Sequence, residues 1–458
     1  MEVNIIGAGL AGAECALQLA KKGIKVNLYE MRPLKPTGAH TTDKFAEFVC
    51  SNSLGSFDIT NASGLLKREM ELLGGELIKI AYECQVPAGG ALAIDRELFS
   101  NKVTEKIEKC ENIKIIKEEV TKIPDGPTVI ASGPLTSSAL ADSIKDFTQN
   151  EHLYFFDAIA PIVEKDSINF DIAFYANRYD KIPDNTLTPN PSPLKGEGRD
   201  DVQNLEAAYL NCPMDKEQYE KFYDILINSP KIELKEFERD AKFFESCLPI
   251  EVLASRGIDT LRYGPMKPVG LIDKRTGKEN YAVVQLRQDN SAKTLYNLVG
   301  FQTNLKWGAQ KELLQSIPGL EGVNIVRYGV MHRNTFINSP KILNAALQTR
   351  KRPDLFFAGQ ITGIEGYSES IASGLLAGIN MARFLQKEEF LILDKKTMLG
   401  ALTRYISDEK HDKFQPINSN WGIVEKIELP KKERKNKKLK NEKLANRSIE
   451  EMQKIIKE

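Results

Sequence analysis

The sequence predicts an α/β fold in which a Rossmann-like domain is interrupted by an α+β insertion domain. Near the N-terminus, VNIIGAG is a short apolar run that stops at a glycine, and a helical pattern and a second alternating run follow it. Late in the chain, DLFFAGQ (354–360) again runs into a glycine before a long helical pattern. Between these regions, short alternating runs such as APIVEK and NYAVVQLRQ are separated by polar loops, which is typical of α+β structure. We therefore expect the chain to leave its first domain and return to it.

The N-terminal region has the pattern of a βαβ unit. Residues 3–6 read as a strand, residues 10–22 have apolar positions at helical spacing, and residues 25–31 read as a second strand. A strand, a helix and a strand within about 30 residues form such a unit, with the two strands parallel.

A glycine motif lies between the first strand and the helix. Gly7, Gly9 and Gly12 form G-x-G-x-x-G, and Glu30 ends the second strand. The first glycine allows the tight turn, the second the approach of a pyrophosphate, and the third the close packing of the helix. The helix N-terminus attracts phosphates, and the glutamate can accept a hydrogen bond from a ribose hydroxyl. We expect these residues to bind a dinucleotide: Gly7, Ala8, Gly9, Leu10, Ala11, Gly12 and Glu30.

Two further segments favour FAD as the dinucleotide. TVIASGP (128–134) is a strand that runs into Gly133, the kind of segment that passes beside the dinucleotide in two-part flavoprotein domains. FFAGQITGIEGY (356–367) adds a late strand, then Gly359 and Gln360, and a glycine-rich turn before a helix. S-adenosylmethionine enzymes also have a glycine-rich Rossmann turn, but they have no need of the late segment. The sequence thus predicts one FAD-binding domain in two parts, with Gly133, Gly359 and Gln360 at the cofactor.

The length of 458 residues leaves room for two or three domains. We predict residues 1–138 and 326–425 as the two parts of the FAD-binding domain, and residues 139–325 as the insertion domain. Within it, NTLTPNPSPLKGEGRDD (185–201) is rich in proline, glycine and asparagine and is expected to be a flexible surface insert. Residues 426–458 hold 12 basic and 6 acidic residues, and we expect a basic, solvated and partly helical tail.

Composition excludes several classes of protein. Hydrophobic residues make up 41% and charged residues 28% of the chain, as in an ordinary folded enzyme. No apolar run reaches the length of about 18 residues that suggests a membrane span, and the N-terminus lacks the pattern of a signal peptide. The six cysteines include no C-x-x-C pair, so we expect neither a disulfide framework nor a metal site. A cytoplasmic protein without membrane contact is the simplest interpretation.

Two cysteines have neighbours that leave their role open. Cys50 lies in EFVCSNSLGS, among small polar residues, and Cys247 lies in KFFESCLPIEVLASRG, which ends near Arg256. Each is either a structural thiol, as most free cysteines are, or a reactive thiol whose ionisation a basic neighbour such as Arg256 favours. The local sequence alone does not decide between these.

The order of several longer strings resembles that of a known family. They are GAGLAGAECALQLA, EMRP, EFVCSNSLGS, GGALAIDRELFS, FFESCLPIEVLASRG, RYGPMKPVGL, YAVVQLRQDN, YNLVGFQTNLKWGAQ, YGVMHRNTFINSPKIL, FFAGQITGIEGYSESIASGLLAGIN and KFQPINSNWG. They are similar to those of the folate- and FAD-dependent methylenetetrahydrofolate–tRNA-(uracil-5-)-methyltransferases over about residues 1–425. The insert at 185–201 and the long lysine-rich tail depart from the family pattern.

The resemblance implies a reaction and roles for the two thiols. In this family, the thiol matching Cys247 adds to C6 of a uracil, so that C5 attacks the methylene carbon of 5,10-methylenetetrahydrofolate. The thiol matching Cys50 acts as the base that removes the C5 proton. Reduced FAD then delivers a hydride, and NADH or NADPH reduces the flavin again. Cys212, in YLNCP, matches a family cysteine that we interpret as structural.

The resemblance also implies tRNA, at its T-arm, as the macromolecular substrate, and no stable protein partner is predicted. The target base must leave its stack to reach the flavin. Basic residues among tyrosines suit phosphates and bases, although each alone is better explained as a surface charge. The candidates for RNA contact are Arg262, Lys267, Arg275, Arg287 and Arg333, with Tyr263, Lys278 and His332 beside them.

Three alternatives remain open on the sequence. The first is the same chemistry on a ribosomal-RNA uridine, because a close relative is hard to separate by motif. The second is a flavin-dependent thiol oxidoreductase without RNA, against which the lack of C-x-x-C counts. The third is an RNA-binding flavoprotein without catalytic activity.

Overall fold

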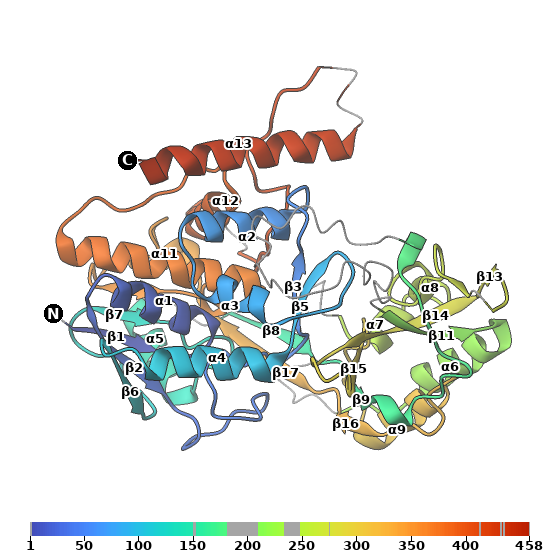
Figure 1. The fold of residues 1–458 in the computed structure, drawn as a ribbon. Coiled ribbons are helices and arrows are strands. Elements are labelled where there is room, and N and C mark those ends of the chain that lie inside the picture. Colours follow the sequence, from blue (N-terminus) through green and yellow to red (C-terminus); the bar gives the residue numbers. More distant parts are fainter. Residues whose placement is uncertain are drawn as a thin grey trace, which may run out of the picture.

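The structure is a computed structural model that describes residues 2–149, 153–180, 209–232, 248–273, 275–411, 414–430, 433 and 436–457. Of residues 153–158, 180, 332, 333 and 457 it describes the backbone alone. Cys247 and the predicted insert at 185–201 lie outside the described residues. Figure 1 shows two lobes, and both ends of the chain lie on the first of them.

The first lobe is built on a five-stranded parallel sheet with the order β18-β7-β1-β2-β6. Its strands are β1 (Glu2–Ile6), β2 (Lys25–Glu30), β6 (Ile113–Lys117), β7 (Thr128–Ile130) and β18 (Leu355–Phe357). Residues of β1 and β7 are buried on both faces, as strands covered by helices on both sides require. Because β18 pairs with β7, the chain returns to its first sheet after the second lobe. This confirms the predicted α/β fold with an interrupted Rossmann-like domain.

Helices α1 (Leu10–Lys21) and α11 (Tyr367–Gln386) pack side by side on this sheet (Figure 1). A Cβ at Gly374 of α11 would lie 2.2 Å from the main-chain oxygen of Ala11 in α1. This backbone approach brings the turn after β18 beside the start of α1. Besides the last helix, α13 (Lys437–Lys457), the lobe contains α2 (Ala62–Leu72), α3 (Leu77–Glu83), α4 (Arg96–Glu108), α5 (Ser138–Thr148), α10 (Ser339–Ile342) and α12 (Met398–Ser407). None of the helices in the described ranges combines the length and apolarity that crossing a membrane requires.

A small antiparallel sheet with the order β3-β5-β4 lies at the side of the first lobe that faces the second. It contains β3 (Ser53–Ser56), β4 (Gln85–Val86) and β5 (Ala91–Ile94). Cys50 lies three residues before β3, so this sheet holds one end of the loop that carries the thiol.

The second lobe contains a six-stranded sheet with the order β10-β11-β14-β15-β9-β16. Its strands are β9 (Ile162–Glu164), β10 (Phe174–Tyr175), β11 (Tyr209–Met214), β14 (Ala282–Gln288), β15 (Leu295–Leu298) and β16 (Ile325–Arg327). Helices α6 (Lys216–Asn228), α7 (Ile250–Ala254), α8 (Thr260–Tyr263) and α9 (Trp307–Gln315) and the hairpin β12–β13 (Ile272–Asp273, Lys278–Glu279) accompany it. Antiparallel pairing dominates this sheet, in contrast to the parallel first one.

The two lobes have separate hydrophobic cores, and one strand pair joins them. The first core draws on residues before 145 and after 335, and the second lies within residues 160–323. β8 (Leu153–Ala158) pairs antiparallel with β17 (Met331–Phe336) between the lobes. This division runs near the predicted domain boundaries, whose positions at 138 and 326 stay a prediction.

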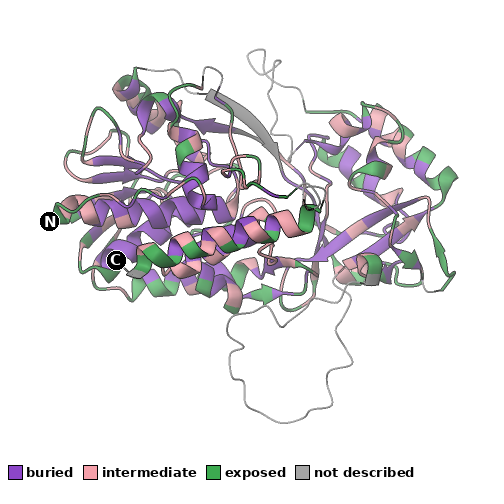
Figure 2. Ribbon diagram, turned by 90° about the horizontal axis from the view of Figure 1, so that it is seen from above, coloured by how far each residue is buried: buried purple, intermediate pink, exposed green. Residues whose placement is uncertain are grey.

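The last helix corrects the expectation of a solvated tail. Helix α13 (Lys437–Lys457) lies along α2 and α12, and Figure 2 shows buried residues recurring along it. Leu444, Ala445 and Met452 are buried, and the Ser448 hydroxyl donates to the Glu69 carboxylate on α2 at 2.5 Å. The basic composition hid an amphipathic stripe at helical spacing, and this stripe packs on the first lobe.

Candidate functional site

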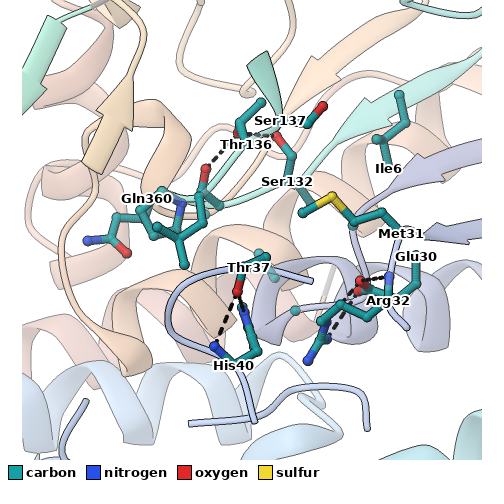
Figure 3. A pocket seen from close by; sticks show the side chains of 18 of the residues that line it. Ile6, Glu30, Met31, Arg32, Thr37, His40, Ser132, Thr136, Ser137 and Gln360 are labelled. Carbon is teal, nitrogen blue, oxygen red and sulfur yellow. Dashed lines mark hydrogen bonds and ion pairs between the residues drawn. The ribbon is translucent and has the colours of Figure 1, made fainter. Parts of the chain in front are cut away.

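A groove runs over the first lobe where four of its chain segments meet. It encloses about 1010 Å³ of space, part of it open to solvent, and is lined by the β1–α1 turn, the end of β2, and the segments after β7 and β18. Figure 3 shows side chains of these segments around the groove. Eight of the ten predicted cofactor residues line it: Gly7, Gly9, Leu10, Ala11, Glu30, Gly133, Gly359 and Gln360. Ala8 and Gly12 lie in the same turn without lining the groove.

The glycine motif forms the floor of the groove. Gly7 has φ +99°, and a Cβ there would lie 2.7 Å from the Ala131 oxygen of the strand beside it. A Cβ at Gly12 would lie 1.8 Å from the Gly7 oxygen, which no side chain allows. Gly9 differs from both, because a Cβ there meets no atom within 4 Å and would enter the groove. Gly9 is also the N-cap of α1 and offers no side-chain cap, so the first N–H groups of the helix stay open to a phosphate.

Glu30 is held by four donors of the protein. Its Oε1 accepts from Arg32 N and Nε, both at 3.0 Å, and its Oε2 accepts from Ala8 N and Arg32 Nη2, both at 3.2 Å (Figure 3). Burial raises the pKa of this carboxyl, but the hydrogen bonds and charge of Arg32 outweigh burial and lower the pKa overall. A carboxylate has about four lone-pair sites, and these four donors already use them. A ribose hydroxyl that donates to Glu30 would therefore have to share a site with a donor of Arg32 or replace it. Arg32, which lies in the EMRP string, is a groove residue that the sequence did not predict.

His40 adds a neutral polar group to the same groove. Its Nδ1 lies 2.6 Å from the Thr37 hydroxyl (Figure 3). Burial and the nearby charge of Arg32 lower the pKa of His40 to about 4. The imidazole is therefore neutral at pH 7 and can exchange hydrogen bonds without adding a second positive charge beside Arg32.

The segments after β7 and β18 close the groove. Gly359 has φ +78°, and its N–H donates to the Ser373 hydroxyl at 2.7 Å, which fixes the late turn on α11. A Cβ at Gly359 would lie 2.9 Å from the Ala11 Cβ, so the late turn touches the first one. Ser132 lies 2.7 Å from Thr136, hydroxyl to hydroxyl, beside Gly133 (Figure 3). Segments far apart in the chain thus share one ligand-sized space.

Cys50 is half-buried in a loop that adjoins this groove. Its N–H donates to the Tyr367 hydroxyl at 2.6 Å. Tyr367 and Val49, the neighbour of Cys50, both line the groove. Main-chain oxygens of the loop accept hydrogen bonds from two arginines: Val49 O from Arg327 Nη2 at 2.8 Å, and Phe48 O from Arg96 Nη1 at 3.2 Å. The loop is therefore held from both lobes.

Further polar contacts fix the second lobe against the Cys50 loop. Arg96 of α4 forms an ion pair with Asp289, which follows β14, at 2.9 Å. Asn52 Nδ2 donates to the main-chain oxygens of Ile94 and Gln288, both at 3.0 Å. The end of β14 therefore lies against the start of β3, next to the thiol.

Comparison with known proteins decides the family. A family model described as glucose inhibited division protein A (GIDA) matches residues 2–389. The methylenetetrahydrofolate--tRNA-(uracil-5-)-methyltransferase TrmFO of Bacillus licheniformis is 55% identical over 436 residues, which cover 95% of each chain. The protein of the same name from Halalkalibacterium halodurans is 54% identical and covers 99% of this chain and 98% of its own. The chain belongs to the TrmFO family.

Solved structures support the fold of this TrmFO-family chain. Aquifex aeolicus GidA in its form II crystal has a TM-score of 0.69 at 18% identity, covering 99% of this chain and 73% of that one. The form I crystal gives a TM-score of 0.67 at 19% identity, covering 98% and 76%. At this identity the likeness concerns the fold alone.

The second predicted catalytic thiol of this TrmFO-family chain, Cys247, lies outside the described residues. Helix α7 begins at Ile250, and the Glu251 carboxylate accepts from the Thr303 hydroxyl at 2.9 Å and from Asn304 N at 2.7 Å. Glu251 thereby anchors the chain just after Cys247 to the second lobe. Arg256, the basic neighbour that the sequence suggested for the thiols, is exposed. Cys212 is buried on β11, and burial raises the pKa of its thiol, as suits a structural residue.

The candidates for RNA contact whose side chains the structure describes do not form one cluster. Arg262 lies over the Tyr281 ring at 3.6 Å, with Lys267 nearby in the chain, and Arg275 pairs with Asp273. Arg287 is 8% exposed on β14. Arg287 lies six residues after Tyr281, the residue that Arg262 contacts, and six residues of extended strand span about 20 Å. Its burial argues against the predicted contact at the surface. The side chain of Arg333 is not among those described.

Proposed function

We propose that this protein methylates C5 of a uridine in the T-loop of tRNA, with 5,10-methylenetetrahydrofolate as the carbon donor and reduced FAD as the hydride donor. The observation that carries the proposal is the 55% identity, over 95% of the chain, to a relative named for this methyl transfer. The groove that Gly7, Gly9 and Glu30 line supports the cofactor part.

The residues of the groove fit a dinucleotide. The space in front of Gly9 and the uncapped start of α1 suit a pyrophosphate. Glu30 and Arg32 offer a fixed carboxylate and a guanidinium for the ribose end, and the neutral His40 lies near them. When bound, FAD supplies the hydride that turns the transferred methylene into a methyl group. NADH or NADPH is the proposed source of that hydride.

The two thiols divide the work on the pyrimidine ring. C5 of uracil is a weak nucleophile, and a thiolate that adds to C6 turns it into an enolate that attacks the methylene carbon. We assign this addition to Cys247. Cys50, beside Val49 and Tyr367 at the groove, removes the C5 proton as tetrahydrofolate departs. The hydrogen bond from Cys50 N to the Tyr367 hydroxyl holds the half-buried loop at the groove. This position supports the role, because a base must come within hydrogen-bond distance of the proton that it removes.

The RNA has to present its base to the groove. A uridine in a folded T-loop must leave its stack, and basic side chains hold the flanking phosphates. We keep Arg262, Lys267, Arg275 and Arg333 as the proposed contacts, and leave out Arg287 because it is buried. Arg262, Lys267 and Arg275 have the better support, since none of the three is buried.

The test uses purified protein, FAD, NADPH and methylenetetrahydrofolate labelled in its methylene group. We expect label in 5-methyluridine of the tRNA T-loop, and none with the Cys247→Ser or Cys50→Ser variant. An RNA with 5-fluorouridine at the target should trap wild type in a covalent complex and should not trap Cys247→Ser. Label in ribosomal RNA alone would overturn the tRNA assignment. Lack of both label and trapping would favour an oxidoreductase without RNA.

A further inference from the structure

The surroundings of Cys50 carry an excess of positive charge. Arg96 of α4 and Arg327 of β16 donate to main-chain oxygens of its loop. Arg287 of β14 precedes Gln288, whose main-chain oxygen accepts from Asn52 Nδ2 at 3.0 Å, two residues after Cys50. Arg287 and Arg327 both interact electrostatically with Cys50. Among the described residues, only Arg96 of these three has a carboxylate within ion-pair distance, that of Asp289.

Arg287 is an unusual group for a protein interior. The residue is 8% exposed, and its Nε has no hydrogen-bond partner within the described part of the chain. Burial lowers the pKa of this guanidinium, and so does the repulsion from Arg96, whereas the attraction of Tyr209, Asp289 and Cys50 acts in the opposite direction. A buried cation without a paired carboxylate destabilises a fold. Proteins tolerate such a destabilising buried charge mainly at functional sites.

Arg327 combines charge with a positional role. Its Nη2 donates to the main-chain oxygens of Ala39 and Val49, both at 2.8 Å. On the other side, Cys50 N donates to the Tyr367 hydroxyl at 2.6 Å. The main chain around the thiol is therefore fixed by groups from both lobes, while the cysteine itself stays half-buried.

We propose that Arg327 and Arg287 bias the Cys50 thiol toward its thiolate form, and that Arg327 also positions this thiol by holding its loop. The proton leaves to solvent and the electron pair stays on Sγ, so that a thiolate balances part of the guanidinium charge. The other titratable groups around the thiol are Glu47, which pairs with Arg32, Asp289, which pairs with Arg96, and the phenols of Tyr209 and Tyr367. Both carboxylates are thus engaged elsewhere. The role of Cys50 in methyl transfer rests on the proposed function. The ionisation of its thiol does not depend on that function.

The test is the rate at which iodoacetamide alkylates Cys50 in the purified full-length protein between pH 6 and pH 9. Mass spectrometry of the Cys50 peptide separates it from the other five cysteines. Since the thiolate is the reacting form, the rate follows its fraction. We expect Arg287→Gln and Arg327→Gln each to lower the rate at pH 7 about tenfold, which equals a shift of one pH unit in the profile. Arg327→Lys should restore most of the rate.

Two readouts separate this role from a structural one. The Cys110 peptide, from a half-buried thiol that none of these arginines contacts in the described structure, should keep its profile in every variant. Arg287→Gln should keep or raise Tm, because it removes an unpaired buried charge. Unshifted profiles in both glutamine variants would overturn the proposal, whatever their Tm. If Arg327→Gln does not fold, the dependence of the alkylation rate on pH in Arg287→Gln and Arg327→Lys tests the proposal. No RNA or folate is present, so this result stands apart from the test of methyl transfer.

Discussion

The dinucleotide groove and the Cys50 loop are neighbours that the chain builds in different ways. The floor of the groove comes from one continuous stretch, in which Gly7 and Gly12 each meet a steric requirement of the backbone and Gly9 leaves space for a ligand. The Cys50 loop depends on side chains from distant places, such as Arg96, Arg327 and Tyr367. Steric contacts within a few residues thus shape the floor of the groove, whereas polar contacts between distant parts of the chain hold the loop.

This difference determines how each region responds to mutation. A steric requirement within one turn fails completely when a single methyl group is added. A loop held by several polar ties loses them one at a time, each at a cost of about 1–3 kcal/mol for a buried group left unpaired. The first region should therefore fail at once where an added Cβ meets backbone, as at Gly12, and the second should weaken in steps.

The largest effect is expected from Gly12→Ala. The added Cβ would lie 1.8 Å from the Gly7 oxygen, a backbone atom that cannot yield without breaking the turn. We expect loss of FAD binding and a fall in Tm that leaves little folded protein. The measurements are visible absorbance of the purified protein and thermal unfolding.

Gly9→Ala is the matched control for that variant. Its Cβ meets no atom within 4 Å and enters only the groove, so Tm without cofactor should stay near that of wild type while FAD affinity falls. Equal losses of Tm in the two alanine variants would contradict the division of roles within the motif.

The next largest effect is expected from Asp289→Asn, which cuts the ion pair between the lobes. The side chains of Arg96 and Asp289 are 12% and 5% exposed, so Arg96 would keep a buried charge without its partner. Breaking such a pair costs about 3 kcal/mol. Denaturant unfolding should show this loss, and methyl transfer should fall with it while FAD stays bound.

A surface ion pair serves as the control for Asp289→Asn. Arg352 and Asp354 pair at 2.9 Å with side chains 22% and 29% exposed. We expect Asp354→Asn to change the free energy of unfolding by less than about 1 kcal/mol. If the two asparagine variants lost the same stability, burial would not distinguish the pairs.

Tyr367→Phe should have a smaller effect, confined to the Cys50 loop. It removes the hydroxyl that accepts from Cys50 N and leaves this N–H without that partner, at a cost of about 1–2 kcal/mol. We expect a lower kcat for methyl transfer at nearly unchanged FAD affinity, measured by initial rates and cofactor titration. Tyr405→Phe, which loses a longer bond to the Gln415 oxygen, is the matched control and should leave kcat unchanged.

The same contrast explains what the sequence predicts and what it does not. The spacing of glycines between a strand and a helix predicted the fold and the floor of the groove, because these depend on backbone geometry within a few residues. Arg327 and Asp289 carry no local signal, since their roles come from a sheet that forms only after the second lobe has folded. The tail was expected to be partly helical, as it is, but the packing of helix α13 was missed for a related reason. Its lysines dominate the composition, while the stripe of Leu444, Ser448 and Met452 makes the contacts.

The smallest effect concerns His40 and reports on charge within the groove. Its pKa is lowered from the ordinary value of 6.5 to about 4 by burial and by Arg32. The stability that this neutral imidazole contributes is fully present above pH 6.5 and is lost progressively as the pH falls toward 4, because the unfolded chain takes up the proton first. Between pH 6.5 and pH 5.5 the loss should be about 1 kcal/mol. Denaturant unfolding of wild type and His40→Gln at both values measures it, and the glutamine variant should lose less. Equal losses of the free energy of unfolding in the two proteins would contradict this prediction. They would mean that neither burial in the groove nor the charge of Arg32 opposes protonation of His40.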